Sequence, residues 1–226
     1  GPLVQGIPPK VQPLLDPDGA VGNPAAPDSA VFYSITNCQE GLRGVSFGNF
    51  LIKQVVEDLS RSFPRLKTFA TLSPVHGFGE WVMNGNDRLS LDDRPTGIRR
   101  MIEKLHLGET REQPIGSSLE VELTRLCASY LMYAKRGNVP LDPVARFHLA
   151  NGASLDRLNW MGDTSPTGLT RSLGFTANYV YRLADVERNH EAYAKTYTIA
   201  ASRQFERLAR LGRRAYDLQT QPHIGS

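Results

Sequence analysis

The sequence predicts a mixed α/β domain in which helices flank a sheet, and three observations lead to this prediction. A strand, a glycine-rich turn, a helix and a second strand follow one another between Val31 and Pro74. An apolar stripe with helical spacing follows Ser117. Two further strand candidates then precede a C-terminal stretch with helical periodicity.

The first unit combines the two periodicities that distinguish strands from helices. Residues from Val31 to Thr36 alternate as a half-buried or fully buried strand does. Five apolar residues then recur at helical spacing and predict an amphipathic helix that Pro64 stops: Ile52, Val55, Val56, Leu59 and Phe63. Thr68 to Leu72 is short, apolar and partly β-branched, so it predicts a second strand that ends at Ser73-Pro74.

Three glycines lie between that first strand and that helix: Gly41, Gly44 and Gly48. Glycine allows positive φ and close backbone approach, and the free N–H groups of the following helix N-terminus attract anions. This order indicates a phosphorylated ligand. The alternative is that the glycines only shape a turn, since a glycine-rich loop is a weak signal by itself.

The rest of the chain predicts further helices and strands, several of them marked by capping residues. A short helix is possible from Ile98 to Leu105, and capping-box spacing at Ser117 to Glu120 opens a core helix that runs toward Gly137-Asn138. Asp142-Pro143 is an N-cap followed by proline, which predicts a short helix over Val144 to Ala150. The remaining predictions are strands at Leu155 to Trp160 and Ala177 to Leu183, and one long helix from Glu187 to Leu218 that buries Tyr193, Tyr197, Ala201, Phe205 and Leu208.

Composition narrows the class of protein. The 226 residues, 40% hydrophobic and 22% charged, suit a soluble globular protein with one large domain. A net charge of +3 without a dense basic patch argues against nucleic acid. No apolar run is long enough to span a membrane, and no signal peptide opens the chain. Cys38 and Cys127 lie far apart in apolar segments, which favours a reducing compartment over a disulfide framework.

The N-terminal residues 1–28 are rich in proline and glycine, so we predict a loop or linker there. Because the chain lacks an initiator methionine, we expect a fragment or a processed product. The predicted organisation is a linker over 1–28, one large domain over 29–219 and a tail over 220–226.

Five segments together resemble one family, in that family's order: FYSITNCQEGLRGVSFGNFLIKQVVEDL, FATLSPVHGF, LDPVARFHLANGA, NWMGD and ANYVYRL. They are similar to the catalytic half of malonyl-CoA decarboxylase, and the likeness runs from Val31 to Leu218. The resemblance implies a GNAT-type N-acetyltransferase-like fold with a mixed sheet. It also implies that the family's helical N-terminal domain and the first strands of the sheet are absent from this chain.

The resemblance assigns roles to residues. It implies that Ser73 and His148 are the catalytic pair. The chemistry of the site makes Tyr181 a candidate for another hydroxyl, from the strand that closes the site. The resemblance also implies that the turn from Gln39 to Asn49 holds the coenzyme A pyrophosphate, through Gln39, Gly41, Arg43, Gly44, Val45, Ser46, Phe47, Gly48 and Asn49. That turn reads Q-x-G-x-x-G, unlike the usual acetyltransferase spelling.

The expected reaction is decarboxylation of malonyl-CoA to acetyl-CoA and CO2. Because the thioester carbonyl accepts the electron pair as an enolate, neither a metal nor an organic cofactor is needed. The site must supply donors for the oxyanion and a proton for the α-carbon. Ser73 and His148 are the candidates for these tasks, and Asn151 or Asn178 would orient them. His76, His106, His190 and His223 lack metal-ligand spacing, so we predict no metal site.

Several alternatives stay open. Taken singly, Ser73 is a turn hydroxyl, His148 a half-buried histidine and Tyr179 and Tyr181 packing residues. The chain could instead be a coenzyme A-dependent acyltransferase or a non-catalytic acyl-CoA-binding fragment. A serine hydrolase is weaker, because TLSP lacks the G-x-S-x-G elbow. We expect malonyl-CoA as the partner, a homo-oligomer in the full-length protein, and either the bacterial cytoplasm or an organelle matrix.

Overall fold

The computed structural model describes residues 3–4, 7, 29–33, 55–56, 58–66, 68–83 and 117–219. Five described strands form one sheet in the order β1-β2-β3-β7-β6. Their bounds are Leu3–Val4, Ser29–Tyr33, Thr68–Pro74, Thr176–Tyr181 and Ser154–Asn159, respectively. β2 and β3 are parallel, whereas the other neighbours are antiparallel, so the sheet is mixed as the sequence predicts.

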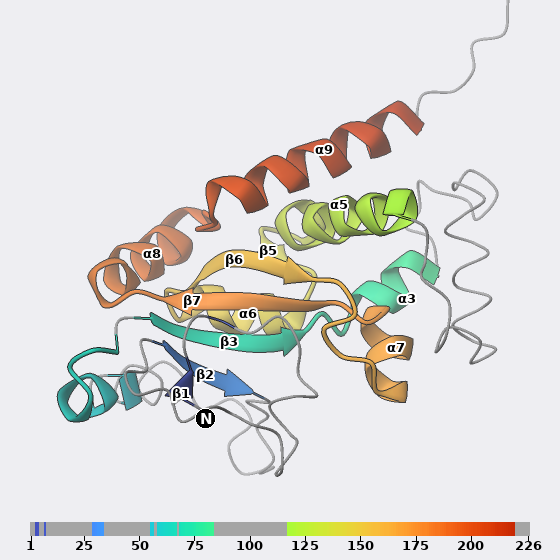
Figure 1. Cartoon of the computed structure of the whole chain (residues 1–226). Coiled ribbons are helices and arrows are strands. Elements are labelled where there is room, and N and C mark those ends of the chain that lie inside the picture. The colour runs from blue at the N-terminus through green and yellow to red at the C-terminus, as the bar shows by residue number, and fades with distance from the viewer. Residues whose placement is uncertain are drawn as a thin grey trace, which may run out of the picture.

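Helices flank this sheet (Figure 1). Among the described residues, the helices are α3 (Phe78–Met83), α5 (Ser117–Tyr133), α6 (Pro143–Ala150), α7 (Pro166–Ser172), α8 (Leu183–Thr196) and α9 (Arg203–Gln219), besides the helical residues 55–56 and 58–62. α5 and α9 run side by side, and α3 and α7 lie together at one end of the sheet (Figure 1). A small hairpin of β4 (Lys135–Arg136) and β5 (Val139–Pro140) joins α5 to α6.

The core lies around β3 and β7, two neighbouring inner strands of the sheet. Every residue of β7 is buried, with Ala177, Tyr179 and Tyr181 on one face and Thr176, Asn178 and Val180 on the other. Alternation along the strands places Thr71 and Ser73 of β3 on the same face as Tyr179 and Tyr181 of β7. The last residues of β3 are less buried than its middle, so Ser73 stands where the core meets the surface.

Most predicted elements are confirmed. The strands predicted from Val31, Thr68, Leu155 and Ala177 correspond to β2, β3, β6 and β7, and the two capped helices correspond to α5 and α6. Residues 55–56 and 58–62 are helical and precede Pro64 as expected. The predicted buried stripe of that helix is wrong in part, since Val55 is 38% and Phe63 41% exposed, whereas Val56 is buried.

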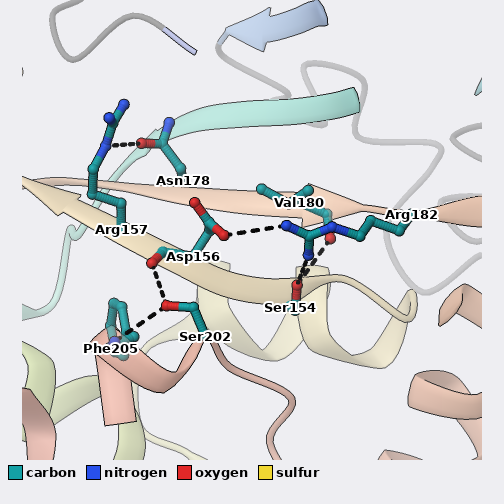
Figure 2. Close-up of polar contacts among 8 residues, drawn as sticks. All are labelled: Ser154, Asp156, Arg157, Asn178, Val180, Arg182, Ser202 and Phe205. Atoms are coloured by element: carbon teal, nitrogen blue, oxygen red, sulfur yellow. Dashed lines mark hydrogen bonds and ion pairs between the residues drawn. The ribbon is translucent and has the colours of Figure 1, made fainter. Parts of the chain in front are cut away.

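The long C-terminal helix is a correction, because the chain divides it into α8 and α9. Tyr197 adopts a left-handed conformation (φ 55°) that ends α8, and its side chain is 37% exposed instead of buried. Ala201 then bridges to Leu155 of β6. The Ser202 hydroxyl accepts from the Phe205 N–H at 3.1 Å and donates to the Asp156 carbonyl at 2.7 Å (Figure 2), which starts α9 against the sheet.

Two more elements differ from the prediction. Leu3–Val4 form the strand β1, paired with β2, where the sequence predicted loop or linker; leucine and valine suit a strand once a partner is available. α7 was not predicted, although Ser165-Pro166 is a cap-and-proline signal like the one that opens α6. The predicted helix at Ile98 to Leu105 and the glycine loop lie outside the described residues.

No described helix has the length and apolar character needed to cross a bilayer. Cys127 is a buried free thiol on α5, and Cys38 lies outside the described residues. The finer prediction of a GNAT-type fold and the domain bounds at residues 28 and 219 stay predictions.

Candidate active site

Three elements bring three predicted residues into one hydrogen-bonded row. Ser73 stands at the end of β3, His148 in α6 and Tyr181 at the end of β7. The Ser73 Oγ lies 3.1 Å from His148 Nε2, and His148 Nδ1 lies 2.8 Å from the Tyr181 hydroxyl. The row therefore links residues that are 75 and 33 positions apart in sequence.

The α6 helix presents His148 to the sheet for local reasons. Asp142 caps its N-terminus, with the side chain accepting from the Ala145 N–H at 2.7 Å, and Pro143 supplies a preset φ for the first turn. Ala145, His148 and Leu149 form the buried side of the helix. The imidazole then stacks on the Tyr179 ring, with centroids 4.4 Å apart and planes 26° apart. Capping and stacking together fix the ring within the row.

The hydrogen-bond directions in the row can be assigned from its serine end. Ser73 Oγ donates to Thr71 Oγ1 at 3.0 Å, which uses its single proton. Ser73 must therefore accept from His148, so Nε2 carries the imidazole proton. In a neutral imidazole Nδ1 is then an acceptor, and the Tyr181 hydroxyl donates to it.

Burial keeps the imidazole in this neutral form. His148 is only 2% exposed, and desolvation lowers its pKa to about 3. Tyr181 is 1% exposed, and burial raises the pKa of its hydroxyl, so the phenol keeps its proton. The resting row is thus uncharged, and it presents N–H and O–H donors in one direction, from Tyr181 toward Ser73 and Thr71.

The members of the row differ in access to solvent. His148 and Tyr181 are buried, whereas Ser73 is partly exposed. A bound molecule would therefore meet the Ser73 hydroxyl first, with His148 supporting it from inside. This arrangement suits an anionic or carbonyl group that develops negative charge, because aligned donors in a dry setting stabilise such charge strongly.

Thr71 and Tyr179 are the contributors to this arrangement that the sequence prediction did not assign to the site. Strand alternation could have found Thr71, since it lies two residues before Ser73 on the same face. Tyr179 was interpreted as packing, and its ring does pack, but against His148. Both residues hold the pair in place without adding a new charge.

The other predicted residues lie elsewhere. Asn178 is on the opposite face of β7 and donates to the Thr71 carbonyl at 2.9 Å. The Asn151 amide donates to the Phe147 carbonyl at 2.6 Å within the α6 C-terminus. The predicted coenzyme A residues Gln39 to Asn49 lie outside the described residues, so their role stays a prediction. Among the residues with described positions, no group of three or more His, Cys, Asp or Glu could hold a metal ion.

The fold and the row define a class: mixed α/β domains that carry a buried histidine between a strand-end serine and a tyrosine. Within this class the chain belongs to the malonyl-CoA decarboxylase C-terminal domain family, which it matches over residues 2–219. The family resemblance inferred from the sequence segments is thereby confirmed.

Curated relatives and solved structures agree with this membership. "Malonyl-CoA decarboxylase, mitochondrial" of Anser anser anser is 40% identical over an alignment of 195 residues, and the match covers 78% of this chain and 39% of that protein. The protein of the same name from Rattus norvegicus is 39% identical, with 78% of this chain and 40% of that protein covered. The chain thus spans about two fifths of the length of these relatives.

Two crystal structures resemble the fold closely. Malonyl-CoA decarboxylase from Rhodopseudomonas palustris is 42% identical with a TM-score of 0.77, covering 91% of this chain and 48% of that one. The enzyme from Agrobacterium vitis is also 42% identical, with a TM-score of 0.79, covering 92% of this chain and 51% of that one. The mixed α/β architecture is therefore that of solved members of the family.

Proposed function

We propose that this chain carries the catalytic site for decarboxylation of malonyl-CoA to acetyl-CoA and CO2. The observation that carries the proposal is the row of Ser73, His148 and Tyr181, in a chain of the malonyl-CoA decarboxylase family. The relatives bear the name of this activity, and the residues that the sequence resemblance assigned to catalysis lie within hydrogen-bond distance of one another.

The chemistry requires stabilisation of one anion and delivery of one proton. The bond between the carboxylate carbon and the α-carbon breaks, CO2 leaves, and the electron pair moves into the thioester as an enolate. The Ser73 hydroxyl turns from Thr71 to the substrate and gives its proton to the α-carbon. The Nε2–H of His148 stabilises the charge that develops on the Ser73 oxygen, and solvent later restores the serine proton.

This division of roles follows from the protonation states. A histidine whose pKa is lowered to about 3 is almost never an imidazolium near pH 7, so it acts as a neutral donor. A preorganised donor of this kind typically contributes a factor of about 10² to 10³ in rate. Tyr181 holds His148 in the tautomer that the role needs. Ser73 is therefore the proposed proton donor and His148 its support.

The same directions argue against a serine hydrolase. A hydrolytic serine gives its proton to a histidine that acts as a base, so Oγ must donate to the imidazole. Here Oγ donates to Thr71, and the direction inferred from this for the 3.1 Å contact with His148 is donation from Nε2–H to Oγ. The row is set for donation toward a substrate anion and not for activation of a nucleophile.

The substrate is bound through its coenzyme A moiety, and we propose that the glycine-rich turn from Gln39 to Asn49 binds the pyrophosphate of that moiety. The support is the resemblance together with the order of strand, glycines and helix.

We further propose a GNAT-type arrangement of the sheet, catalysis without a metal or organic cofactor, and a homo-oligomeric full-length protein. Two relatives are named mitochondrial, and an organelle matrix or the bacterial cytoplasm is the compartment we propose for this one.

One assay tests the function. The purified protein is incubated with malonyl-CoA alone, and acetyl-CoA and CO2 are measured. Release of both without any acceptor supports decarboxylation. A requirement for an added amine would identify an acyltransferase instead. Binding of malonyl-CoA with no turnover, in this chain and in a longer form of the protein, would refute decarboxylation and favour a binding fragment.

A further inference from the structure

Asp142 is a buried carboxylate between the two segments that carry Ser73 and His148. It is 1% exposed, and as the N-cap of α6 it begins the helix that holds His148. One oxygen, Oδ1, accepts from the Ala145 N–H at 2.7 Å, in the first turn of that helix. This bond alone would be an ordinary helix cap.

The second oxygen reaches a different part of the chain. Oδ2 accepts from the Gly77 N–H at 3.4 Å, in the loop that follows β3 and Ser73. A side chain at Gly77 would collide with the Tyr130 hydroxyl of α5, so the loop backbone lies tightly between α5 and α6. A single carboxylate therefore joins the loop behind Ser73 to the helix of His148.

The choice of an acid at this position calls for an explanation, because a serine caps a helix at lower desolvation cost. Ser165 does so for α7, accepting from the Gly168 N–H at 3.0 Å. Burial of Asp142 raises its pKa, and the backbone N–H groups that point at it oppose this effect. Only a forked side chain offers one oxygen to each of two backbone segments. The second bond is what the carboxylate adds.

We propose that Asp142 is a positioning residue that holds the Ser73 hydroxyl and the His148 ring at their 3.1 Å separation. This inference rests on the proposed function of the pair. If the link is cut, the end of β3 and α6 relax independently, and a displacement of about 1 Å at reacting groups costs roughly a hundredfold in rate.

The test uses three substitutions of Asp142, each made in the full-length protein. Asp142→Ser keeps an oxygen for the cap of α6 and loses the reach to Gly77. We expect kcat for malonyl-CoA to fall by about tenfold or more, with KM within about twofold, because substrate binding is not the step affected. Asp142→Ala removes both bonds and should be at least as slow. Asp142→Asn keeps the size but has one acceptor oxygen, and its NH2 group would face the second backbone N–H, so its kcat should fall as in Asp142→Ser.

The matched control is Ser165→Ala, which removes the cap of α7, a helix that supplies no member of the row. We expect a loss of thermal stability comparable to that of Asp142→Ser and an unchanged kcat. A kcat of Asp142→Ser equal to that of Ser165→Ala would overturn the proposal. So would a folded Asp142→Asn protein that keeps the wild-type kcat.

A structural readout separates this proposal from the function on which it rests. In a crystal structure of Asp142→Ser, the Ser73 to His148 separation should be clearly longer than in wild type, whether or not the enzyme turns over. An unchanged separation contradicts the positioning role. A longer separation, together with a wild-type protein that fails to decarboxylate malonyl-CoA, upholds the positioning role and refutes the proposed function alone.

Discussion

The two faces of β7 carry two polar clusters that differ in chemistry. One face presents Tyr179 and Tyr181 to His148, and beyond it to Ser73 of β3. The other face presents Asn178, which donates to the Thr71 carbonyl at 2.9 Å and accepts from the Asn159 amide at 2.9 Å. Both clusters lie on the same inner strands, and both are buried at β7.

The difference lies in which protons can move. The amide cluster contains groups that neither gain nor lose a proton near neutral pH, and it ties β3, β7 and β6 together. Arg157 extends this cluster, with its Nε donating to the side-chain oxygen Oδ1 of Asn178 at 3.4 Å (Figure 2). The other row contains two hydroxyls and an imidazole, and it ends at a partly exposed serine. We therefore expect substitutions on the first face to alter stability and substitutions on the second to alter rate.

The largest expected effect is on the row. Ser73→Ala and His148→Ala should each lower kcat by about 10² to 10³, because each removes a donor needed when charge develops, while malonyl-CoA still binds. Steady-state kinetics and binding titration measure the two quantities. Ser154→Ala, which removes a hydroxyl on β6 that contacts the Val180 carbonyl, is the control and should leave kcat unchanged. Full activity in both row variants would mean that the site is elsewhere.

The next largest expected effect concerns the face of β7 that carries Asn178. Asn178→Ala removes the bond to the buried Thr71 carbonyl and one of the two bonds of the Asn159 amide, which keeps its 3.2 Å bond to Thr176 Oγ1, so it should lower the free energy of unfolding by about 1 to 3 kcal/mol. Urea denaturation measures this loss. Asn189→Ala, which removes a half-buried amide bond to the Gly152 carbonyl, should cost less. A hundredfold fall in kcat of a stable Asn178→Ala protein would show that the two faces are not separable.

The row and its supports were only partly predictable from the sequence. The cap at Asp142, the proline after it and the strand at Thr68 are local signals, and each was predicted correctly. The approach of Ser73 to His148 is a contact across 75 positions, which no local periodicity contains. The family resemblance indicated the pair. Neither it nor the local pattern indicated that Asp142 also reaches Gly77, 65 positions away.

The break between α8 and α9 was also not predictable from the local sequence, because it too depends on contacts between distant segments. Tyr193, Tyr197, Ala201 and Phe205 recur every four residues, so the helical pattern continues through the break. The bridge of Ala201 to Leu155 and the bond of Ser202 to the Asp156 carbonyl override that local preference. These contacts depend on where β6 lies, and the sequence around Tyr197 does not encode that position.

A pH prediction follows from the buried imidazole. The pKa of His148 is lowered from 6.5 to about 3 in the folded protein, so below pH 6.5 the unfolded chain binds a proton that the folded chain does not. The contribution of this group to stability is therefore complete above pH 6.5 and is lost as pH falls toward 3. The slope is at most about 1.4 kcal/mol per pH unit. Urea denaturation of wild type and His148→Gln at several pH values isolates it, since the variant lacks this group; parallel curves would contradict a neutral buried His148.

The smallest expected effect distinguishes the hydrogen bond of Tyr181 to His148 from the packing of Tyr179 against His148. Tyr181→Phe keeps a ring that lies edge-on to His148, at 6.1 Å and 70°, and removes only the hydroxyl. Loss of one hydrogen bond worth about 1 kcal/mol should lower kcat by about five- to tenfold, because Nδ1 is no longer held as an acceptor, while KM stays nearly constant. The matched variant is Tyr179→Phe, which keeps the stacking ring and all bonds of the row, and its kcat should equal that of wild type. If Tyr179→Phe is the slower of the two, His148 is oriented by the neighbouring phenol and not by Tyr181. If neither variant is slower than wild type, stacking alone orients the His148 ring. Tyr181 is then a packing residue, and only His148 and Ser73 of the row take part in catalysis.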